Sequence, residues 1–482
     1  MAGKFSNDRA AGALVGLATG DALGAGYEFG SARFTGTAQM IGGGLGGFAP
    51  GEWTDDTSMA VCIAQVAATG HLEATAVAAG FLDWYRSDPP DIGIQTREVL
   101  GEAADADDVA ARSAARFARL PEHSAGNGAL MRTAPVALAH LGDDTAILAA
   151  AAEISALTHA DPVSGEACAL WCIAIDRAIR EQRLDGIRDG LRLLADDRAV
   201  WWHDRLDEAE HAPLERFRPN GYVVTALQAA HGAIATTPVP DDVPAHHLQD
   251  TLHRVIGIGD DTDTTAAIAG QLLGARWGVS AIPFRWRRLL HGWPGLTGAD
   301  LARLATLTVQ GGRSDASGWP GPTLQSGYAP AYLAELPGDD GVLLGNLASL
   351  EEATGRVDAV ISLCRVGTGQ VPSHLEHHEI RLIDLPEPHR NPNLGFVLTD
   401  TAAAIPQLRA EGKRVFLHCV DGRSRTPTVA ATYLAQRDGI SGQQAWQQLA
   451  TLLPDATTDN TTFQRWLSDL HPDTPGTTTT LR

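Results

Sequence analysis

The sequence is poor in three features that would place a protein in a class at once: cysteine, excess positive charge and long hydrophobic runs. It has 5 cysteines in 482 residues, scattered without a framework spacing, which argues against a disulfide scaffold and predicts reduced thiols. It also lacks an apolar run of bilayer-spanning length and a signal-peptide pattern. We therefore expect a cytoplasmic protein without a membrane partner.

The shortage of positive charge narrows the choice of partners. Lysine and arginine number 37 against 58 aspartates and glutamates, which gives a formal net charge of −21 at pH 7. Nucleic acids and anionic membranes offer such a chain no counter-charge, so we expect neither as a partner. A small anionic ligand is compatible with this charge, because the local field of a site can oppose the global one. The length predicts two or more domains.

Acidic and hydroxyl residues are concentrated in two short stretches, each followed by an apolar helical pattern. They are Thr54-Asp55-Asp56-Thr57 and Gly259-Asp260-Asp261-Thr262-Asp263-Thr264-Thr265. Helix capping is one interpretation, because aspartate and threonine cap helix N-termini. A cap needs only one such residue, however, and clusters of carboxylates and hydroxyls suit hard divalent cations such as Mg²⁺. The spacing alone leaves capping and metal binding open.

The pattern from the N-terminus to about residue 310 is almost entirely helical, with no convincing strand. Gly12, Gly16, Gly20 and Gly24 recur every four residues, so they share one face of a helix and allow a neighbouring backbone to approach closely. Asp21, near the end of this run, is expected to accept structural hydrogen bonds rather than to act in catalysis. The sequence therefore predicts an all-α domain over residues 1–310.

Several motifs in this region occur in the order of a known family. Asp8-Arg9, the glycine repeat and Glu28 resemble the opening of the ADP-ribosylglycohydrolases of the dinitrogenase-reductase-activating type. The family's other signatures follow as Thr54-Asp55-Asp56-Thr57, Gly126-Asn127-Gly128-Ala129-Leu130-Met131-Arg132, Thr158-His159 and Asp261-Thr262-Asp263-Thr264. The resemblance covers roughly residues 5–310. It implies hydrolytic removal of ADP-ribose from a protein side chain or a small acceptor.

The resemblance also implies a set of site residues. Two Mg²⁺ (or Mn²⁺) ions would be held by Thr54, Asp55, Asp56, Asp261, Asp263 and Thr264. Glu28 and Asp56 would be catalytic, with Glu28 gating the metal site and touching the scissile ribose. ADP-ribose would be bound by Gly126, Asn127, Gly128, Met131, Arg132 and His159.

Other interpretations of the ADP-ribose residues remain open. Gly126-Asn127-Gly128 is expected to open a helix and offer N–H groups to a phosphate, although such a tripeptide is usually just a turn. Arg132 either opposes the diphosphate or bridges helices, and His159 is equally well a core histidine. Tyr222 could stack on adenine.

A change of composition marks a second domain. Residues 311–330 are rich in Gly, Ser, Pro and Thr without periodicity, which predicts a linker. Short buried-strand patterns follow at 342–347, 359–364, 380–383 and 415–418, with helical patterns between and after them. We predict an α/β domain with a mainly parallel sheet over residues 331–472 and a disordered tail at 473–482.

The last of these strands runs into a phosphatase signature. His418-Cys419-Val420-Asp421-Gly422-Arg423-Ser424-Arg425-Thr426 resembles the His-Cys-x5-Arg motif of cysteine-dependent phosphatases, nearest the dual-specificity group, over roughly residues 335–470. A loop at a helix N-terminus points N–H groups at a phosphate and favours the thiolate of Cys419 as the nucleophile. Phosphate would be bound by Val420, Asp421, Gly422, Arg423, Ser424 and Arg425.

The remaining phosphatase roles follow from the same motif. Arg425 would grip two phosphoryl oxygens, and Thr426 would hydrogen-bond the thiolate when the cysteinyl-phosphate breaks down. Asp384 is the predicted general acid, with Glu387 as the alternative. No metal is expected in this domain. Cys364 closes the strand at 359–364, so its sulfur and that of Cys419 are expected at the same end of the sheet.

These observations predict a bifunctional hydrolase acting on ADP-ribosylated proteins or small molecules and on phosphorylated substrates. The alternative is a catalytically silent ADP-ribose-binding module that targets a protein-tyrosine phosphatase. Intact acids at Asp55, Asp56, Asp261 and Asp263 speak against that alternative, because a binding module does not need a full set.

Overall fold

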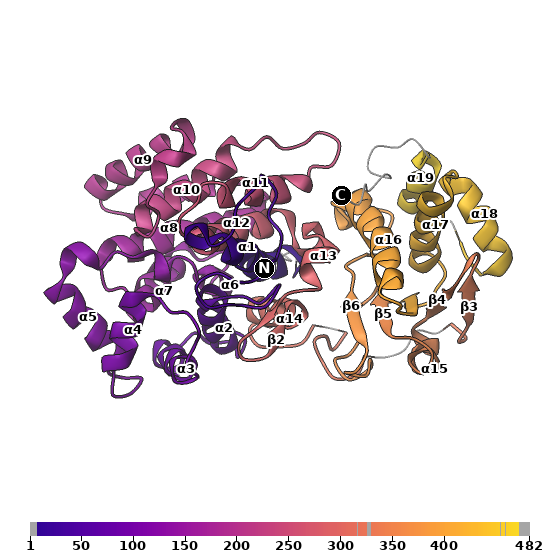
Figure 1. The fold of residues 1–482 in the computed structure, drawn as a ribbon, viewed down its shortest axis with the longest axis horizontal. Coiled ribbons are helices and arrows are strands. Elements are labelled where there is room, and N and C mark those ends of the chain that lie inside the picture. The colour runs from indigo at the N-terminus through magenta and orange to yellow at the C-terminus, as the bar shows by residue number, and fades with distance from the viewer. Residues whose placement is uncertain (1–6, 316, 325–328, 454, 458, 472–482) are drawn as a thin grey trace. The chain divides into compact units, whose positions relative to one another are not determined.

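The computed structural model describes residues 7–315, 317–324, 329–453, 455–457 and 459–471, and it divides into two compact units (Figure 1). The first comprises Met1–Ile282 and Trp286–Arg313, and the second comprises Pro283–Arg285 and Ser314–Arg482. The predicted tail at 473–482 lies outside the described residues. No helix within the described ranges combines the length and apolarity that crossing a membrane requires.

The first unit is helical, as predicted. Its longer helices are α1 (Asn7–Gly24), α2 (Asp55–Ala67), α3 (Ala74–Arg86), α4 (Ile94–Glu102), α5 (Val109–Arg119), α6 (Ala134–Ala139), α7 (Asp144–Ala156), α8 (Pro162–Glu181), α9 (Asp196–His211), α10 (Val223–Thr236), α11 (His246–Ile256), α12 (Thr262–Trp277) and α14 (Gly298–Val309). The short α13 (Phe284–Arg287) spans the residues at which the two units are divided. A two-residue antiparallel pair, β1 (His291–Gly292) with β2 (Leu296–Thr297), was not predicted.

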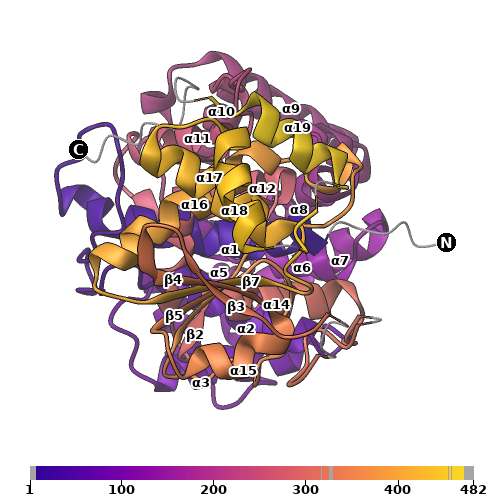
Figure 2. The same cartoon turned by 90° about the vertical axis from the view of Figure 1, so that its right-hand side faces the viewer.

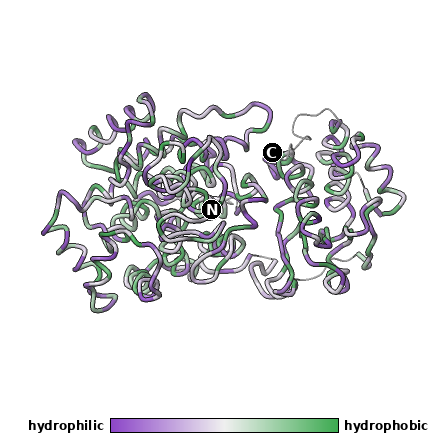
Figure 3. Tube along the Cα trace, in the orientation of Figure 1, coloured by the Kyte–Doolittle hydropathy of each residue, from purple (hydrophilic) through white to green (hydrophobic). Residues whose placement is uncertain are grey.

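The helices differ in how much of their circumference is buried. The outer helix α9 buries only Trp202, Leu206 and Ala209, which recur at helical spacing, and it shows mixed hydropathy in Figure 3. Helices α1 and α12 are instead buried on almost every side. They form the centre of the first unit.

The predicted glycine face of α1 packs directly on α12, and this prediction is confirmed. A Cβ added to Gly16 would lie 2.3 Å from the carbonyl oxygen of Gly270, and one added to Gly20 would lie 2.0 Å from that of Ala266. The contact continues to the end of α1, where a Cβ on Gly24 would lie 2.5 Å from the backbone of Asp263. Because these glycines have no side chains, the backbones of α1 and α12 come into direct contact, and the end of α1 lies against the acidic start of α12.

The second unit is an α/β domain, as predicted. Its sheet has the order β3 (Leu333–Leu336), β4 (Asp339–Asn346), β7 (Val415–Cys419), β5 (Ala359–Ser362) and β6 (Glu376–Glu379), and only β3–β4 is antiparallel. Figure 2 shows α16 (Leu394–Ala410), α17 (Arg425–Asp438), α18 (Gly442–Leu452) and α19 (Thr461–Asp469) on one face and α15 (Leu350–Thr354) on the other.

The central strand β7 is buried on both faces, and its alternating side chains enter two cores. Leu417 packs in the core beneath α16–α19, while Phe416 packs in the core on the α15 side. Parallel register places Asn346 of β4 opposite Cys419 and Ser362 of β5 opposite His418. The carboxyl ends of three parallel strands therefore meet beside Cys419.

The predicted strand at 380–383 is wrong. The strand is β6, four residues earlier, with the polar sequence Glu376-His377-His378-Glu379. It pairs on one side only, with β5, so a hydrophobic pattern is not required of it. The buried Ile380 and Leu382, which prompted the prediction, lie just beyond the ladder.

Residues 314–324, from the predicted linker, belong by contact to the second unit. The N–H groups of Thr368 and Gly369 donate to the carbonyls of Gly321 and Pro322, each at 2.9 Å. Trp319 is buried, and the guanidinium of Arg365 lies 4.4 Å from the centre of its ring. This segment therefore supports the loop that follows β5.

Candidate active sites

Asp21 of α1 holds the start of α2 in the first unit. Its carboxylate accepts hydrogen bonds from the N–H groups of Thr54 and Thr57, both at 3.0 Å, and from the Thr57 hydroxyl at 2.5 Å. Asp21 therefore accepts hydrogen bonds, as predicted, and these bonds join the end of α1 to the start of α2. Thr54 is the N-cap of α2 and accepts from the N–H of Asp56, so capping and acid clustering occur together.

The start of α12 lies against the same acids. Thr264 donates to Asp56 at 3.1 Å, and Asp263 is 3% exposed. Carboxylate oxygens of Asp21, Asp56 and Asp263 lie within 4.8 Å of one another, and those of Glu28, Asp261 and Asp263 form a second such group. Asp263 is common to both groups, so the two acidic stretches of the sequence build one continuous site.

Burial raises the pKa of every acid in this site. It raises the pKa of Asp21 to about 6, that of Asp55 to about 7 and that of Glu28 to about 8, with the charges of neighbouring carboxylates adding to the shift for Asp55 and Glu28. The pKa values of Asp56 and Asp263 are raised well above the ordinary value by the same two causes. So many buried carboxylates repel one another unless a positive charge lies among them.

The donor set fits divalent cations. Buried carboxylate oxygens with an adjacent threonine hydroxyl are the ligands that Mg²⁺ and Mn²⁺ prefer, and Asp263 could bridge two ions. No arginine or lysine is paired with Asp56 or Asp263 by a salt bridge seen in the described part of the chain. Asp55, also predicted as a ligand, accepts a hydrogen bond from the N–H of Gly93 at 3.3 Å and stands outside both groups of three.

Gly126-Asn127-Gly128 forms a turn that is tied to the acidic site. It does not open an α-helix as predicted: a short 3-10 helix covers Asn127–Ala129, and α6 begins only at Ala134. The Asn127 side chain instead bridges the carbonyl of Asn220 and the carboxylate of Asp261, at 3.1 and 2.7 Å. The turn is thereby fixed to α12 without help from a helix dipole.

His159 explains why this turn contains glycines. A Cβ on Gly126 or Gly128 would lie 3.2 or 2.9 Å from the His159 ring. The ring is 3% exposed and shares a hydrogen bond of 2.8 Å with Thr158 Oγ1, and burial together with the charge of Arg132 holds its pKa well below the ordinary value. His159 is therefore neutral and forms the floor of the turn.

Arg132 lies behind His159 and is 1% exposed. Its guanidinium donates to Thr158 Oγ1 at 2.7 Å and stacks on Phe81, and burial lowers its pKa to about 10. In this structure Arg132 bridges helices, and Met131 is buried beside it. Tyr222 is 44% exposed, and its backbone pairs with that of Gly126 in an isolated bridge, so this residue follows the turn closely in space.

In the second unit the phosphatase motif forms a loop between β7 and α17. Cys419 is 1% exposed and its sulfur accepts from the N–H of Gly422 at 3.2 Å. Tyr332 supports the loop, since its hydroxyl donates to the carbonyl of Gly422 at 2.8 Å. Thr426 donates to the carbonyl of Gly345 at 3.3 Å.

Arg425 and Asp384 meet over this loop. Arg425 donates through Nη1 to the carbonyl of Leu363 at 2.8 Å, and its buried Nε has no hydrogen-bond partner in the described residues. Asp384 Oδ2 lies 3.8 Å from that Nε, and Asp384 Oδ1 accepts from Ser424 at 2.9 Å and from Asn460 at 3.0 Å. Glu387 is exposed. The geometry brings Asp384, rather than Glu387, to the loop.

A buried chain of polar groups runs behind Cys419. Ser362 Oγ lies 2.7 Å from His418 Nε2 and 3.0 Å from His377 Nε2. Burial lowers the pKa of His418 to about 4, so it is neutral at pH 7. These hydrogen-bonded side chains connect β6, β5 and β7 beneath the loop.

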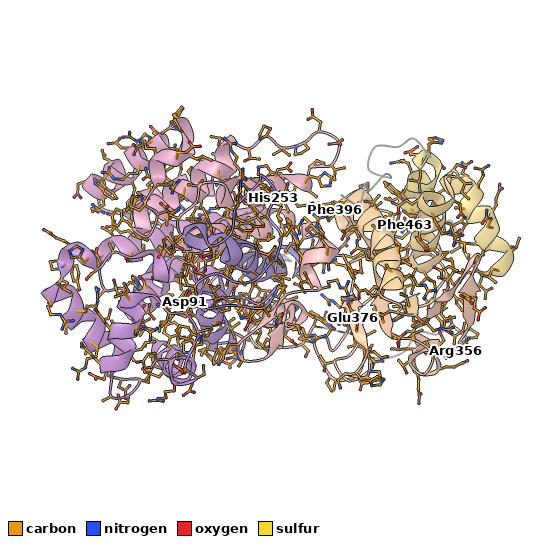
Figure 4. The ribbon with its side chains drawn as sticks, in the orientation of Figure 1. Asp91, His253, Arg356, Glu376, Phe396 and Phe463 are labelled. Carbon is orange, nitrogen blue, oxygen red and sulfur yellow. The ribbon has the colours of Figure 1, made fainter. Side chains whose placement is uncertain are left out.

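Sequence reasoning did not single out four residues of these sites: Asp91, Asn220, Tyr332 and Asn460. Asp91, labelled in Figure 4, lies between α3 and α4, and its charge contributes to the raised pKa values of Glu28 and Asp55. A lone acid after two prolines carries no signal of its own. Asn460 could have been noticed as a helix N-cap, but its bond to Asp384 spans 76 residues.

A family model described as ADP-ribosylglycohydrolase matches residues 3–315. The chain belongs to the ADP-ribosylglycohydrolase family. A second model, the dual specificity phosphatase catalytic domain, matches residues 352–472. Both resemblances seen in the sequence are thereby confirmed, and both domains belong to hydrolase families.

Relatives and solved structures include members of both families. ADP-ribosylarginine hydrolase Tri1 of Serratia proteamaculans is 32% identical over 295 residues, which is 58% of this chain and 75% of the relative. The ADP-ribosyl-dinitrogen-reductase glycohydrolase of Rhodospirillum rubrum is 31% identical over 292 residues, which is 59% of this chain and 91% of the relative. The crystal structure of human DUSP28 is 22% identical and covers 30% of this chain and 94% of its own, with a TM-score of 0.26.

Proposed function

We propose that the chain is a bifunctional hydrolase whose first domain removes ADP-ribose from arginine and whose second domain hydrolyses phosphate monoesters. One observation carries the first half: Asp263 belongs to two groups of three carboxylates, all buried except the half-buried Asp261, where α1 and the residues after it meet the starts of α2 and α12. Relatives named for ADP-ribosylarginine and ADP-ribosyl-dinitrogen-reductase hydrolysis support the choice of reaction.

The acids of the first domain would hold two Mg²⁺ or Mn²⁺ ions. Asp56, Asp261 and Asp263 are the central ligands in this proposal, with Thr54, Asp55 and Thr264 beside them. When bound, such ions polarise the distal ribose and activate water. Hydrolysis breaks the bond from the anomeric carbon to the arginine nitrogen, and water supplies a hydroxyl to ADP-ribose and a proton to the leaving guanidine.

The other residues of the first domain would position the substrate. Gly126, Asn127 and Gly128, packed on His159, would receive the ADP-ribose, with Met131 and Arg132 supporting the turn from within. Tyr222 is exposed enough to stack on adenine. Glu28, 6% exposed, accepts from the N–H of Leu45 and would touch the scissile ribose.

In the second domain, Cys419 would attack phosphorus and Asp384 would protonate the departing alcohol oxygen. The buried Nε of Arg425 supports this assignment, because it has no hydrogen-bond acceptor among the described residues and a phosphoryl oxygen would supply one. The N–H groups from Val420 to Arg425 would surround the phosphate. Thr426 would assist water in releasing phosphate from the sulfur.

The substitution Asp261→Asn tests the metal site within the intact chain. It should abolish Mg²⁺ binding and release of ADP-ribose from ADP-ribosylarginine, while turnover of p-nitrophenyl phosphate by the same sample stays within about twofold. In the wild type, a chelator should likewise stop the release of ADP-ribose and leave the turnover of p-nitrophenyl phosphate unchanged. Calorimetry that found unchanged Mg²⁺ affinity in the variant would contradict the two-group site.

A further inference from the structure

Arg132 is a buried cation surrounded by neutral groups. It is 1% exposed, and burial lowers its pKa only to about 10, so the guanidinium stays charged at neutral pH. Its contacts in the described part of the chain are the sulfur of Met59 at 3.3 Å, the hydroxyl of Thr158 at 2.7 Å and the ring of Phe81. Its buried Nε has no acceptor among those residues. None of these groups carries a compensating negative charge.

A second buried arginine near His159 does have such a partner. Arg116 is 7% exposed, and its guanidinium binds the Glu98 carboxylate at 2.7 Å. The charge of Asp55 reaches Arg132 only from beyond salt-bridge distance. A buried charge is unfavourable when no opposite charge lies beside it. An anionic ligand bound nearby would supply the counter-charge that Arg132 lacks.

Thr158 connects Arg132 to His159 through two hydrogen bonds of fixed direction. A guanidinium has donors only, so Arg132 Nη2 donates to Thr158 Oγ1. The other contact of that hydroxyl in the described residues is with His159 Nδ1, at 2.8 Å. Because Thr158 is fully buried and its own proton needs an acceptor, the hydroxyl donates to Nδ1. His159 is neutral, so its single proton lies on Nε2. We call these three residues the hydrogen-bond relay.

The Nε2–H of His159 lies under the glycine turn. Nε2 is 3.2 Å from the position that an added Cβ would take on Gly126 and equally far from that on Gly128. The described residues give this N–H no acceptor. Gln95 holds the same corner from α4, because its amide donates to the carbonyl of Thr158 at 2.8 Å. The position and direction of the His159 donor are therefore set before a ligand arrives.

Hydrogen bonds that point in one direction polarise one another, most strongly in a medium of low dielectric. In the hydrogen-bond relay each donor points away from Arg132: first the guanidinium N–H, then the hydroxyl, then the imidazole N–H. The last donor therefore brings part of the effect of a buried positive charge to the turn, and an anionic oxygen gains most from it. The site thus attracts an anion within a chain of net charge −21.

We propose that Arg132 and Thr158 are positioning residues for ADP-ribose: they hold His159 as a neutral Nε2–H donor to a diphosphate oxygen, and the charge of Arg132 acts through the hydrogen-bond relay. This inference rests on the proposed glycohydrolase function and describes how that site takes its anionic ligand. It also joins the two interpretations of Arg132 that the sequence left open. Arg132 bridges helices and opposes the diphosphate without touching it.

The test measures binding of three probes to the full chain by calorimetry in the presence of Mg²⁺: ADP-ribose, ADP and adenosine. Thr158→Val removes the hydroxyl at nearly constant volume, so it should weaken ADP-ribose and ADP about tenfold and leave adenosine within about twofold. Thr158→Ser keeps the hydroxyl and should bind all three like wild type. Thr133→Val is the matched control and should change nothing, because Thr133 is 3% exposed and its hydroxyl contacts Cys172 Sγ at 3.2 Å.

Two further measurements follow the hydrogen-bond relay itself. With isotope-labelled histidine, nuclear magnetic resonance of the wild type should place the His159 proton on Nε2, and Thr158→Val should lose this fixed tautomer. The signal is assigned by its absence in His159→Gln. Because Arg132 acts through Thr158, the double variant Arg132→Met, Thr158→Val should bind ADP-ribose no more weakly than Arg132→Met alone.

Equal weakening of all three probes by Thr158→Val would overturn the proposal, because a disturbed fold gives that pattern. Weaker ADP-ribose with unchanged ADP would overturn it as well, since the donor would then serve the distal ribose. Additive losses in the double variant would show that Arg132 acts independently of Thr158. A wild type that binds ADP-ribose and leaves ADP-ribosylarginine uncleaved contradicts the proposed function alone, whereas a wild type that binds no probe contradicts both.

Discussion

The side-chain amide of Asn460 donates to the carboxylate of Asp384, with 3.0 Å between Nδ2 and Oδ1. The same side chain caps α19, because its Oδ1 accepts from the N–H groups of Thr462 and Phe463. One residue therefore links the start of a C-terminal helix to the loop that carries the proposed general acid.

Replacing Asn460 should separate these two tasks. Asn460→Ser keeps a capping residue and removes the amide, so stability should change little while phosphatase turnover falls about tenfold. The loss should be larger for phenyl phosphate than for p-nitrophenyl phosphate, since a poor leaving group depends more on a correctly placed acid. Equal losses on both compounds would show that Asn460 does not position Asp384. Glu387→Gln should have no such effect.

The close contact between α1 and α12 predicts that adding a single methyl group to a glycine of α1 will destabilise the first domain. Gly16→Ala should destabilise the first domain by about 1–3 kcal/mol, because the new Cβ would overlap the carbonyl of Gly270. Gly165→Ala in α8 is the matched control: its Cβ would lie 3.5 Å from Ala152, an ordinary contact, so the better helix former should be neutral or stabilising. Calorimetric melting of both variants distinguishes these outcomes, and equal shifts would contradict the packing.

The sequence predicted what depends on local pattern and missed what depends on distant pairing. The spacing of Gly12 to Gly24 was sufficient to predict a close helix contact, although it could not name α12 as the partner. The edge strand β6 is polar and lacks the hydrophobic alternation from which a strand is predicted. The buried Ile380 and Leu382 follow it in the sequence, so the strand was predicted four residues too late. The Asp21–Thr57 and Asn460–Asp384 bonds arise only when separate elements pack together.

Stability of the second domain should depend on pH through His418. The folded protein holds the pKa of this buried histidine at about 4, against about 6.5 when it is exposed on unfolding. The unfolded state therefore binds the extra proton between these values, and stability present above pH 6.5 is lost as the pH falls towards 4, by about 3 kcal/mol. In His418→Gln this loss should be absent, so the difference in melting temperature between wild type and variant should shrink on acidification. A difference in melting temperature that stays constant with pH would show that His418 does not cause the loss of stability in acid.

Cys364 is predicted to protect Cys419 from irreversible oxidation. It lies two residues beyond Ser362, where β5 ends beside β7, and burial raises its pKa to about 12. The sulfenic acid formed at Cys419 by peroxide would condense with the Cys364 thiol to give a disulfide and water. Peptide mapping should find this link, and thiol should restore activity. In Cys364→Ser recovery should fail, whereas Cys62→Ser, at a buried cysteine of the first domain, should recover like wild type.

The glycine contact between α1 and α12 also sets the order in which the chain can mature during synthesis. Thr262 bonds to the carbonyl of Gly24 across 238 residues, so the first helix emerges from the ribosome long before its partner exists. At about 5–20 residues per second the nascent helix waits on the order of 10–50 seconds. Through that interval the glycine face of α1 lacks the helix that covers it in the folded protein, so the centre of the first unit can form only after α12 has been synthesised.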